Sequence, residues 1–168
     1  MEITYREFWT LVHGMGLGAV FLLAYAGGLA ELWALRGVEE TAAGLASRTR
    51  RLLIGTWLMA GAAWGVVLTG TWIVYPWYRE EGGIRDALLA NPNTELWHTF
   101  GMEWKEHVAW IAPFLATAVA VIIWHYRRHP KKLEALRKPL IVTFTAAFLI
   151  AGVAGLFGAM ITKAGPIR

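Results

Sequence analysis

Four long apolar runs separated by charged connectors constrain this chain more than any other feature of its sequence. The runs cover residues 8–35, 52–78, 104–126 and 140–162. Each is long enough to cross a hydrocarbon core about 30 Å thick, which needs about 20 helical residues. A soluble domain of 168 residues would carry more charge than the 17% found here. The pattern predicts an all-α integral membrane protein, a four-helix bundle that forms a single transmembrane domain over residues 1–168.

The connectors between the runs are polar and carry weaker signals. Asn91-Pro92-Asn93 is typical of a turn, and residues 84–90 before it favour a short surface helix. Residues 37–44 favour a loop or a short surface segment. Glu31, near the end of the first run, is expected at the membrane interface, facing Arg36.

The distribution of lysine and arginine predicts the orientation. Ten of the sixteen lie in the connectors after the first and third runs: Arg36, Arg48, Arg50, Arg51, Arg127, Arg128, Lys131, Lys132, Arg137 and Lys138. The positive-inside rule places this side in the cytoplasm. Both termini and the connector 79–103 are then expected outside. Orientation also explains the net charge of +4, so we expect membrane lipid and no nucleic acid as a partner.

The chain has no cysteine. This excludes disulfides, thiolate metal sites, iron–sulfur clusters and covalently attached c-type haem.

Two histidines stand at matching depths on the first and third runs, which cross the membrane in the same direction. His13 lies five residues into its run and His107 three residues into its own. At a rise of 1.5 Å per residue, they are about 7.5 and 4.5 Å from the outer helix ends. Two imidazoles so placed can ligate one haem iron from opposite faces. We therefore predict that His13 and His107 bind one haem near the outer face, and without cysteine this haem is b-type.

The surroundings of the two histidines agree with a porphyrin. Gly14, followed by Gly16 and Gly18, leaves room for a macrocycle beside His13. Arg6, Arg79 and Lys105 lie near the outer surface, where haem propionates need cationic partners. Four further residues on the second and fourth runs are expected at a similar depth: Gly70, Thr71, Gly155 and Gly158.

Other interpretations of the same residues remain open. Each histidine can be merely interfacial, hydrogen-bonded to water or to a neighbouring carboxylate. Met160 is an alternative axial ligand, whereas His125 has no histidine partner on another run at its own depth. An outward-facing metal site is a further alternative, with four candidate ligands: His98, Glu103, Glu106 and His107.

Glycines on two of the runs have the spacing of close helix contacts. Gly61-x-x-x-Gly65 places two glycines on one face of the second helix. Gly152, Gly155 and Gly158 line one side of the fourth helix at a spacing of three. We expect both faces to pack against a neighbouring backbone or a flat cofactor.

The four apolar runs with their inward-facing histidines resemble the small four-helix b-type cytochrome subunits of respiratory complexes, which are linked to quinone. Such subunits often carry two haem layers, whereas this chain supplies one matched pair. The phrases Tyr75-Pro76-Trp77-Tyr78-Arg79 and Lys105-Glu106-His107 are also similar to an uncharacterised family of small bacterial membrane proteins. The resemblance implies a multi-pass protein of the bacterial inner membrane.

Two functions from different classes fit this sequence. The first is an electron-transfer subunit, rather than a stand-alone enzyme, that exchanges electrons between quinol in the bilayer and an external redox partner. Glu103 or Glu106 would accept the quinol proton. The second is a cofactor-free accessory subunit that packs against other subunits of a membrane complex, or against further copies of itself, through its glycine faces.

Overall fold

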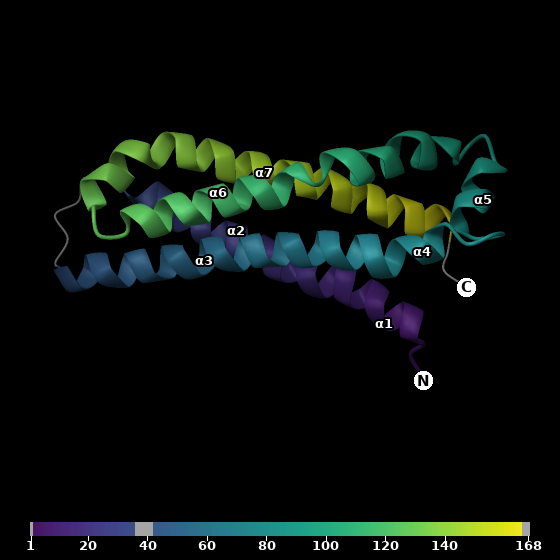
Figure 1. Cartoon of the computed structure of the whole chain (residues 1–168), viewed down its shortest axis with the longest axis horizontal. Coiled ribbons are helices and arrows are strands. Elements are labelled where there is room, and N and C mark those ends of the chain that lie inside the picture. Colours follow the sequence, from purple (N-terminus) through teal and green to yellow (C-terminus); the bar gives the residue numbers. More distant parts are fainter. Residues whose placement is uncertain (1, 36–41, 166–168) are drawn as a thin grey trace.

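The computed structural model describes residues 2–35 and 42–165. It confirms the all-α class, since these residues contain no strand. Four helical stretches are long and apolar enough to cross a membrane: Tyr5–Ala34, Ala43–Tyr78, Trp97–Tyr126 and Pro130–Ala164. We call them the first to fourth spans. They run up and down beside one another, so that α1, the end of α7 and the short helix α5 lie at one end of the bundle (Figure 1). We call this the α5 end.

Three of the four spans contain π-helical segments. The first span consists of α1 (Tyr5–Leu11), a π-helical segment (Val12–Gly16) and α2 (Leu17–Ala34). The second consists of α3 (Ala42–Thr69), a π-helical segment (Gly70–Val74) and α4 (Tyr75–Tyr78). The connector carries α5 (Ile84–Leu89), and the third span consists of two π-helical segments (Trp97–Met102 and Trp104–Val108) and α6 (Ile111–Tyr126). The fourth span is the single helix α7 (Pro130–Ala164).

All four spans begin earlier than hydropathy predicts, the first by only three residues. The second, third and fourth spans begin at residues 43, 97 and 130, instead of 52, 104 and 140. Arg48 and Lys131 therefore lie on helices and not in connectors. Hydropathy detects the part of a helix that meets lipid, whereas a polar stretch continues the same helix into water. Pro130 opens the fourth span in its first turn, where a proline costs no hydrogen bond.

The packed core fills the half of the bundle away from α5. Helix α2 packs against α3 and α7, and α6 packs against the same two helices, so the four spans form a closed ring. Fully buried side chains from all four spans meet inside it: Leu32, Leu52, Met59, Ile123 and Phe144. Burial of such side chains holds the helices in their places.

Helices α2 and α3 approach each other closely at two glycines. A Cβ on Gly55 would lie 3.4 Å from the backbone of Gly28. A Cβ on Gly28 would lie 2.9 Å from two ring carbons of Phe144. At Gly28 even a Cβ would clash with the Phe144 ring, whereas at Gly55 a Cβ would be in contact with the Gly28 backbone and a larger side chain would be excluded.

The predicted glycine faces are wrong in part. A Cβ on Gly61, Gly152 or Gly155 would have nothing within 4 Å, so these three glycines do not pack against a neighbouring backbone. Gly65 contacts the side chain of Leu17. A spacing of three or four residues places glycines on one face of a helix, but it does not say whether that face meets a helix or lipid.

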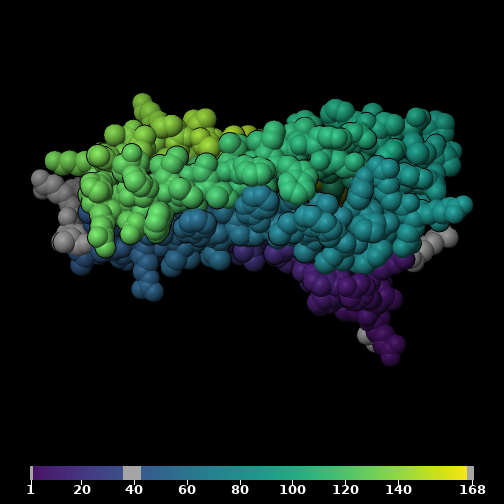
Figure 2. Space-filling model, in the orientation of Figure 1, coloured from purple at the N-terminus to yellow at the C-terminus, as the bar shows by residue number. Residues whose placement is uncertain are grey.

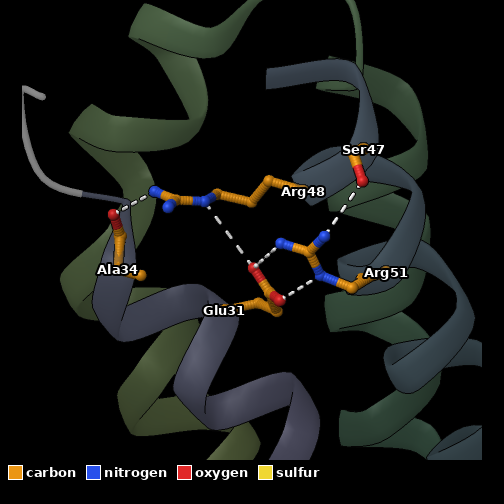
Figure 3. Close-up of polar contacts among 5 residues, drawn as sticks. All are labelled: Glu31, Ala34, Ser47, Arg48 and Arg51. Carbon is orange, nitrogen blue, oxygen red and sulfur yellow. Dashed lines mark hydrogen bonds and ion pairs between the residues drawn. The ribbon is translucent and has the colours of Figure 1, made fainter. Parts of the chain in front are cut away.

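The opposite end of the bundle is joined by an ion-pair cluster around Glu31 of α2 (Figure 3). The Glu31 carboxylate lies 2.5 Å from Nε of Arg51 and 3.7 Å from Nε of Arg48, both on α3. Arg48 also donates to the carbonyl oxygen of Ala34 at 2.6 Å. Glu31 therefore pairs with α3; the expected partner Arg36 lies outside the described residues.

A second, smaller apolar cluster closes the α5 end. Its buried members are Tyr78, Leu88, Met102 and Ile161. Helix α5 and the turn after it confirm the prediction for the connector: the Thr94 amide donates to the carbonyl oxygen of Asn91 at 2.9 Å. The connector is thus folded against the ends of the spans.

Candidate functional site

A cavity of about 1300 Å³ lies between the two apolar clusters. Its lining includes Phe21 from the large cluster and Tyr78 and Met102 from the small one. All four spans and the connector contribute residues. In Figure 2 the face toward the reader is hollowed at this end, between the second and third spans. Ligand cavities usually measure about 300–1,000 Å³, so this space is large enough for a cofactor.

The π-helical segments of the described chain all border this cavity. Lining residues come from each of the four: His13 from the first, Gly70 from the second, Met102 from the third and Lys105 from the fourth. A π-helical segment widens the helix locally, and such segments occur often at functional sites. The rest of the bundle is regular α-helix. The departure from regular geometry is therefore concentrated where the cavity is.

His13 is held in one tautomer by the second span. Its Nδ1 lies 2.9 Å from Oγ1 of Thr69, and the Thr69 hydroxyl donates its single hydrogen to the carbonyl oxygen of Gly65 at 2.7 Å. The Thr69 oxygen is therefore the acceptor, and Nδ1 of His13 carries the hydrogen. This leaves Nε2 with a free lone pair, the form of imidazole that ligates metals.

The imidazole of His13 lies against Gly70. A Cβ at position 70 would be 2.8 Å from Cε1 of His13, so only a glycine admits the ring there. Gly14 and Gly18, one helical turn apart, both line the cavity, and a Cβ on either would have nothing within 4 Å. Gly16, two residues from each, does not line it. The predicted room beside His13 is thus provided by the glycines at a spacing of four.

His107 lies outside the cavity, and the structure does not bring it to His13. Its side chain is 69% exposed, and its Nδ1 lies 3.0 Å from the carbonyl oxygen of Glu103 on its own helix. Between residues 102 and 109, the cavity residues of the third span recur every three or four positions, at Met102, Lys105, Glu106 and Ala109. His107 is not among the lining residues of this span. The third span is turned so that Lys105 and Glu106 line the cavity while His107 faces outward.

The three predicted cations have different surroundings. Arg6 lines the cavity mouth and forms a two-pronged ion pair with Glu80, at 2.8 Å to each oxygen. Arg79 is not a lining residue; its guanidinium lies 3.7 Å from Glu106 and 5.1 Å from the ring centre of Tyr75. Lys105 lines the cavity, with its Nζ against Gly158 of α7.

The alternative metal site is not assembled. Within residues 2–35 and 42–165, no three His, Asp or Glu side chains come close enough to hold a metal ion. His98 instead forms a 2.7 Å hydrogen bond with the hydroxyl of Tyr78, while Glu106 faces the cavity and Glu103 faces outward with His107. Met160 is not among the lining residues, and His125 is exposed at the other end of the third span.

Two polar atoms at the cavity are buried without a hydrogen-bond partner: Thr10 Oγ1 and Glu106 Oε1. Such atoms cost free energy unless water or a ligand satisfies them. Thr10 and Thr69 were not predicted as site residues. The position of Thr10, three residues before His13 on the same helical face, was a readable signal. For Thr69 no signal exists in the sequence, because its role depends on how α3 is rotated.

Comparison of the chain with protein-family models, with curated proteins and with solved structures gave no match. The assignment of the site therefore depends on its geometry and chemistry.

Proposed function

We propose that this protein is a membrane electron-transfer protein that holds one b-type haem in the cavity between the two apolar clusters. The observation that carries the proposal is the free Nε2 of His13, on a residue that borders a cofactor-sized cavity inside a membrane bundle. A polar, metal-ligating side chain within a membrane span is a functional residue by default, because its desolvation is costly.

The residues around His13 fit a haem in three respects. Thr69 fixes the tautomer, as the outer partner of a metal-ligating histidine usually does. Gly14 and Gly18 leave one wall of the cavity flat. The chain supplies one histidine rather than the expected pair, so we propose a single histidine ligand, as in the haem proteins that keep one coordination position open.

When bound, a haem supplies one-electron chemistry, and the chain's own residues would hold and orient it. We propose quinol in the bilayer and an external redox protein as the exchange partners. Of the two carboxylates considered for the quinol proton, Glu106 is favoured because it lines the cavity and has a buried, unpaired oxygen. Glu103 is half exposed and lies beside His107.

The absorption spectrum of the purified protein tests the proposal. We expect a haem band in the wild-type protein, either as isolated or after reconstitution with hemin. With one histidine ligand the spectrum should be high-spin and should become low-spin when imidazole is added. A wild-type protein that takes up no haem under either condition would refute the proposal.

The accessory-subunit function is the second candidate. The observation that favours it is that Gly61 and Gly152 lie on outer faces with open space around them, where a helix of another subunit can approach closely. It leaves the cavity without a role. Absence of haem, together with co-purification of a fixed partner, would favour this function.

We propose that the α5 end faces the outside of a bacterial inner membrane, because ten of the sixteen basic residues follow the first and third apolar runs in the sequence, which end away from α5. A reporter fused after Arg128, in the turn before α7, is then expected to be active only in its cytoplasmic form. A reporter fused after Pro92 should be active only in its exported form. The reverse pattern would place the cavity in the inner half of the membrane and would leave the histidine proposal intact.

A further inference from the structure

Lys105 places a basic nitrogen inside the cavity, and none of the carboxylates of the described chain forms an ion pair with it. A Cβ on Gly158 would lie 2.6 Å from Nζ of Lys105, so the nitrogen occupies the space that any other residue at 158 would fill. No carboxylate or hydrogen-bond acceptor of the described chain pairs with this nitrogen. Lys105 is also within electrostatic range of His13, so the two basic side chains face the same space.

An unpaired lysine in this position is costly. Basic side chains within membrane spans pair with an acid or with carbonyl oxygens, because the surrounding medium solvates them poorly. Arg6 and Arg79 have such partners in Glu80 and Glu106. Of the three cations expected near the site, Lys105 is therefore the one without a partner in the described chain, and it is free to pair with an acid on a ligand.

We propose that Lys105 binds a carboxylate group of the molecule that fills the cavity. We call this binding position the seat. The seat is formed by the π-helical segment Trp104–Val108 and by Gly158, and it opens into the same cavity as His13. The ligand is therefore a largely apolar molecule that carries an acidic group, and neutral quinones and neutral lipids are not its main occupants. If the ligand is the haem, which rests on the proposed function, the acid is a propionate. A fatty acid has the same chemistry, and the experiment has to separate these two sources.

Matched pairs of acid and ester probe the seat. The purified protein in neutral detergent is titrated with hemin and with hemin dimethyl ester, and separately with oleate and with methyl oleate. Each pair differs in the acidic group and hardly at all in the apolar body. An ionic hydrogen bond to Lys105 should make the wild-type protein prefer one acid over its ester by roughly ten- to a hundredfold.

Three variants locate the effect. Lys105→Met keeps the length of the side chain and should abolish the preference for the acid. Gly158→Ala keeps the lysine but displaces its flexible end, so it should lower the preference even if Lys105→Met fails to fold. Lys138→Met removes an exposed lysine of α7 that does not line the cavity, and it should keep the wild-type preference.

The outcomes separate the two proposals. Hemin preferred over its ester, with the preference lost in Lys105→Met, supports both. Oleate preferred over methyl oleate in a protein that binds no hemin supports the seat and refutes the haem. Hemin and its ester bound equally well, or a preference that survives in both Lys105→Met and Gly158→Ala, overturns the seat while the haem proposal stands. A protein that prefers neither acid also overturns the seat.

Discussion

We expect His13→Ala to abolish haem binding by the purified protein, and His107→Ala to leave it unchanged. His13 is the histidine that borders the cavity, with its Nε2 free, whereas the His107 side chain is 69% exposed on the outside of the third span. The measurement is haem content per protein, with the ferrous spectrum, in the wild-type protein and both variants. The two changes are chemically identical, so the comparison separates a ligand from an interfacial histidine.

Thr69→Val provides a finer test of the same arrangement. It preserves the shape of the side chain but removes the acceptor of the His13 Nδ1 hydrogen. Loss of the outer partner of a metal-ligating histidine typically weakens binding by about 10- to 100-fold. Loss of haem in His107→Ala, with retention in His13→Ala, would contradict the assignment of His13. Loss in both variants, with fold retained, would restore the predicted pair of ligands.

The spans could be predicted from the sequence because hydropathy is a property of consecutive residues. A helix in lipid satisfies its own backbone, so an apolar run of sufficient length has one structure available to it. The starts of the second and fourth helices could not be read in the same way. Arg48 and Lys131 are polar, and whether a polar stretch continues a helix depends on capping and on contacts such as that of Arg48 with Glu31.

For the site, too, one property could be predicted from the sequence and another could not. Depth in the membrane follows from counting residues, and four residues chosen for their depth, Gly70, Thr71, Gly155 and Gly158, do line the cavity. Rotation about the helix axis depends on tertiary packing, and it turned His107 away from His13. The periodicity of the third span contained part of this information. Met102, Lys105, Glu106 and Ala109 share one helical face, and His107 does not belong to it.

The spacing of glycines along one helix did not predict where two helices meet, for a related reason. A close contact needs two glycines on different helices at the same level, and spacing along one helix says nothing about the partner. Gly28 and Gly55 belong to no conspicuous motif, yet they meet where α2 crosses α3. Gly61 belongs to the motif and meets nothing.

This contrast yields the last prediction: Gly55→Leu should destabilise the protein, and Gly61→Leu should not. Both glycines lie in α3, and both changes raise its helix propensity by the same amount, so the difference reports the contact across helices. A side chain on Gly55 would meet the Gly28 backbone at 3.4 Å and the Ala24 carbonyl oxygen at 3.5 Å, and neither can rotate away. Overpacking of this kind costs about 1–3 kcal/mol. The midpoint of unfolding, measured by titrating the detergent-purified variants with a denaturing detergent, should fall for Gly55→Leu and stay at the wild-type value for Gly61→Leu. Equal midpoints for the two variants would mean that α2 and α3 do not cross at Gly28 and Gly55, and the ring of four spans would then have to close in another way.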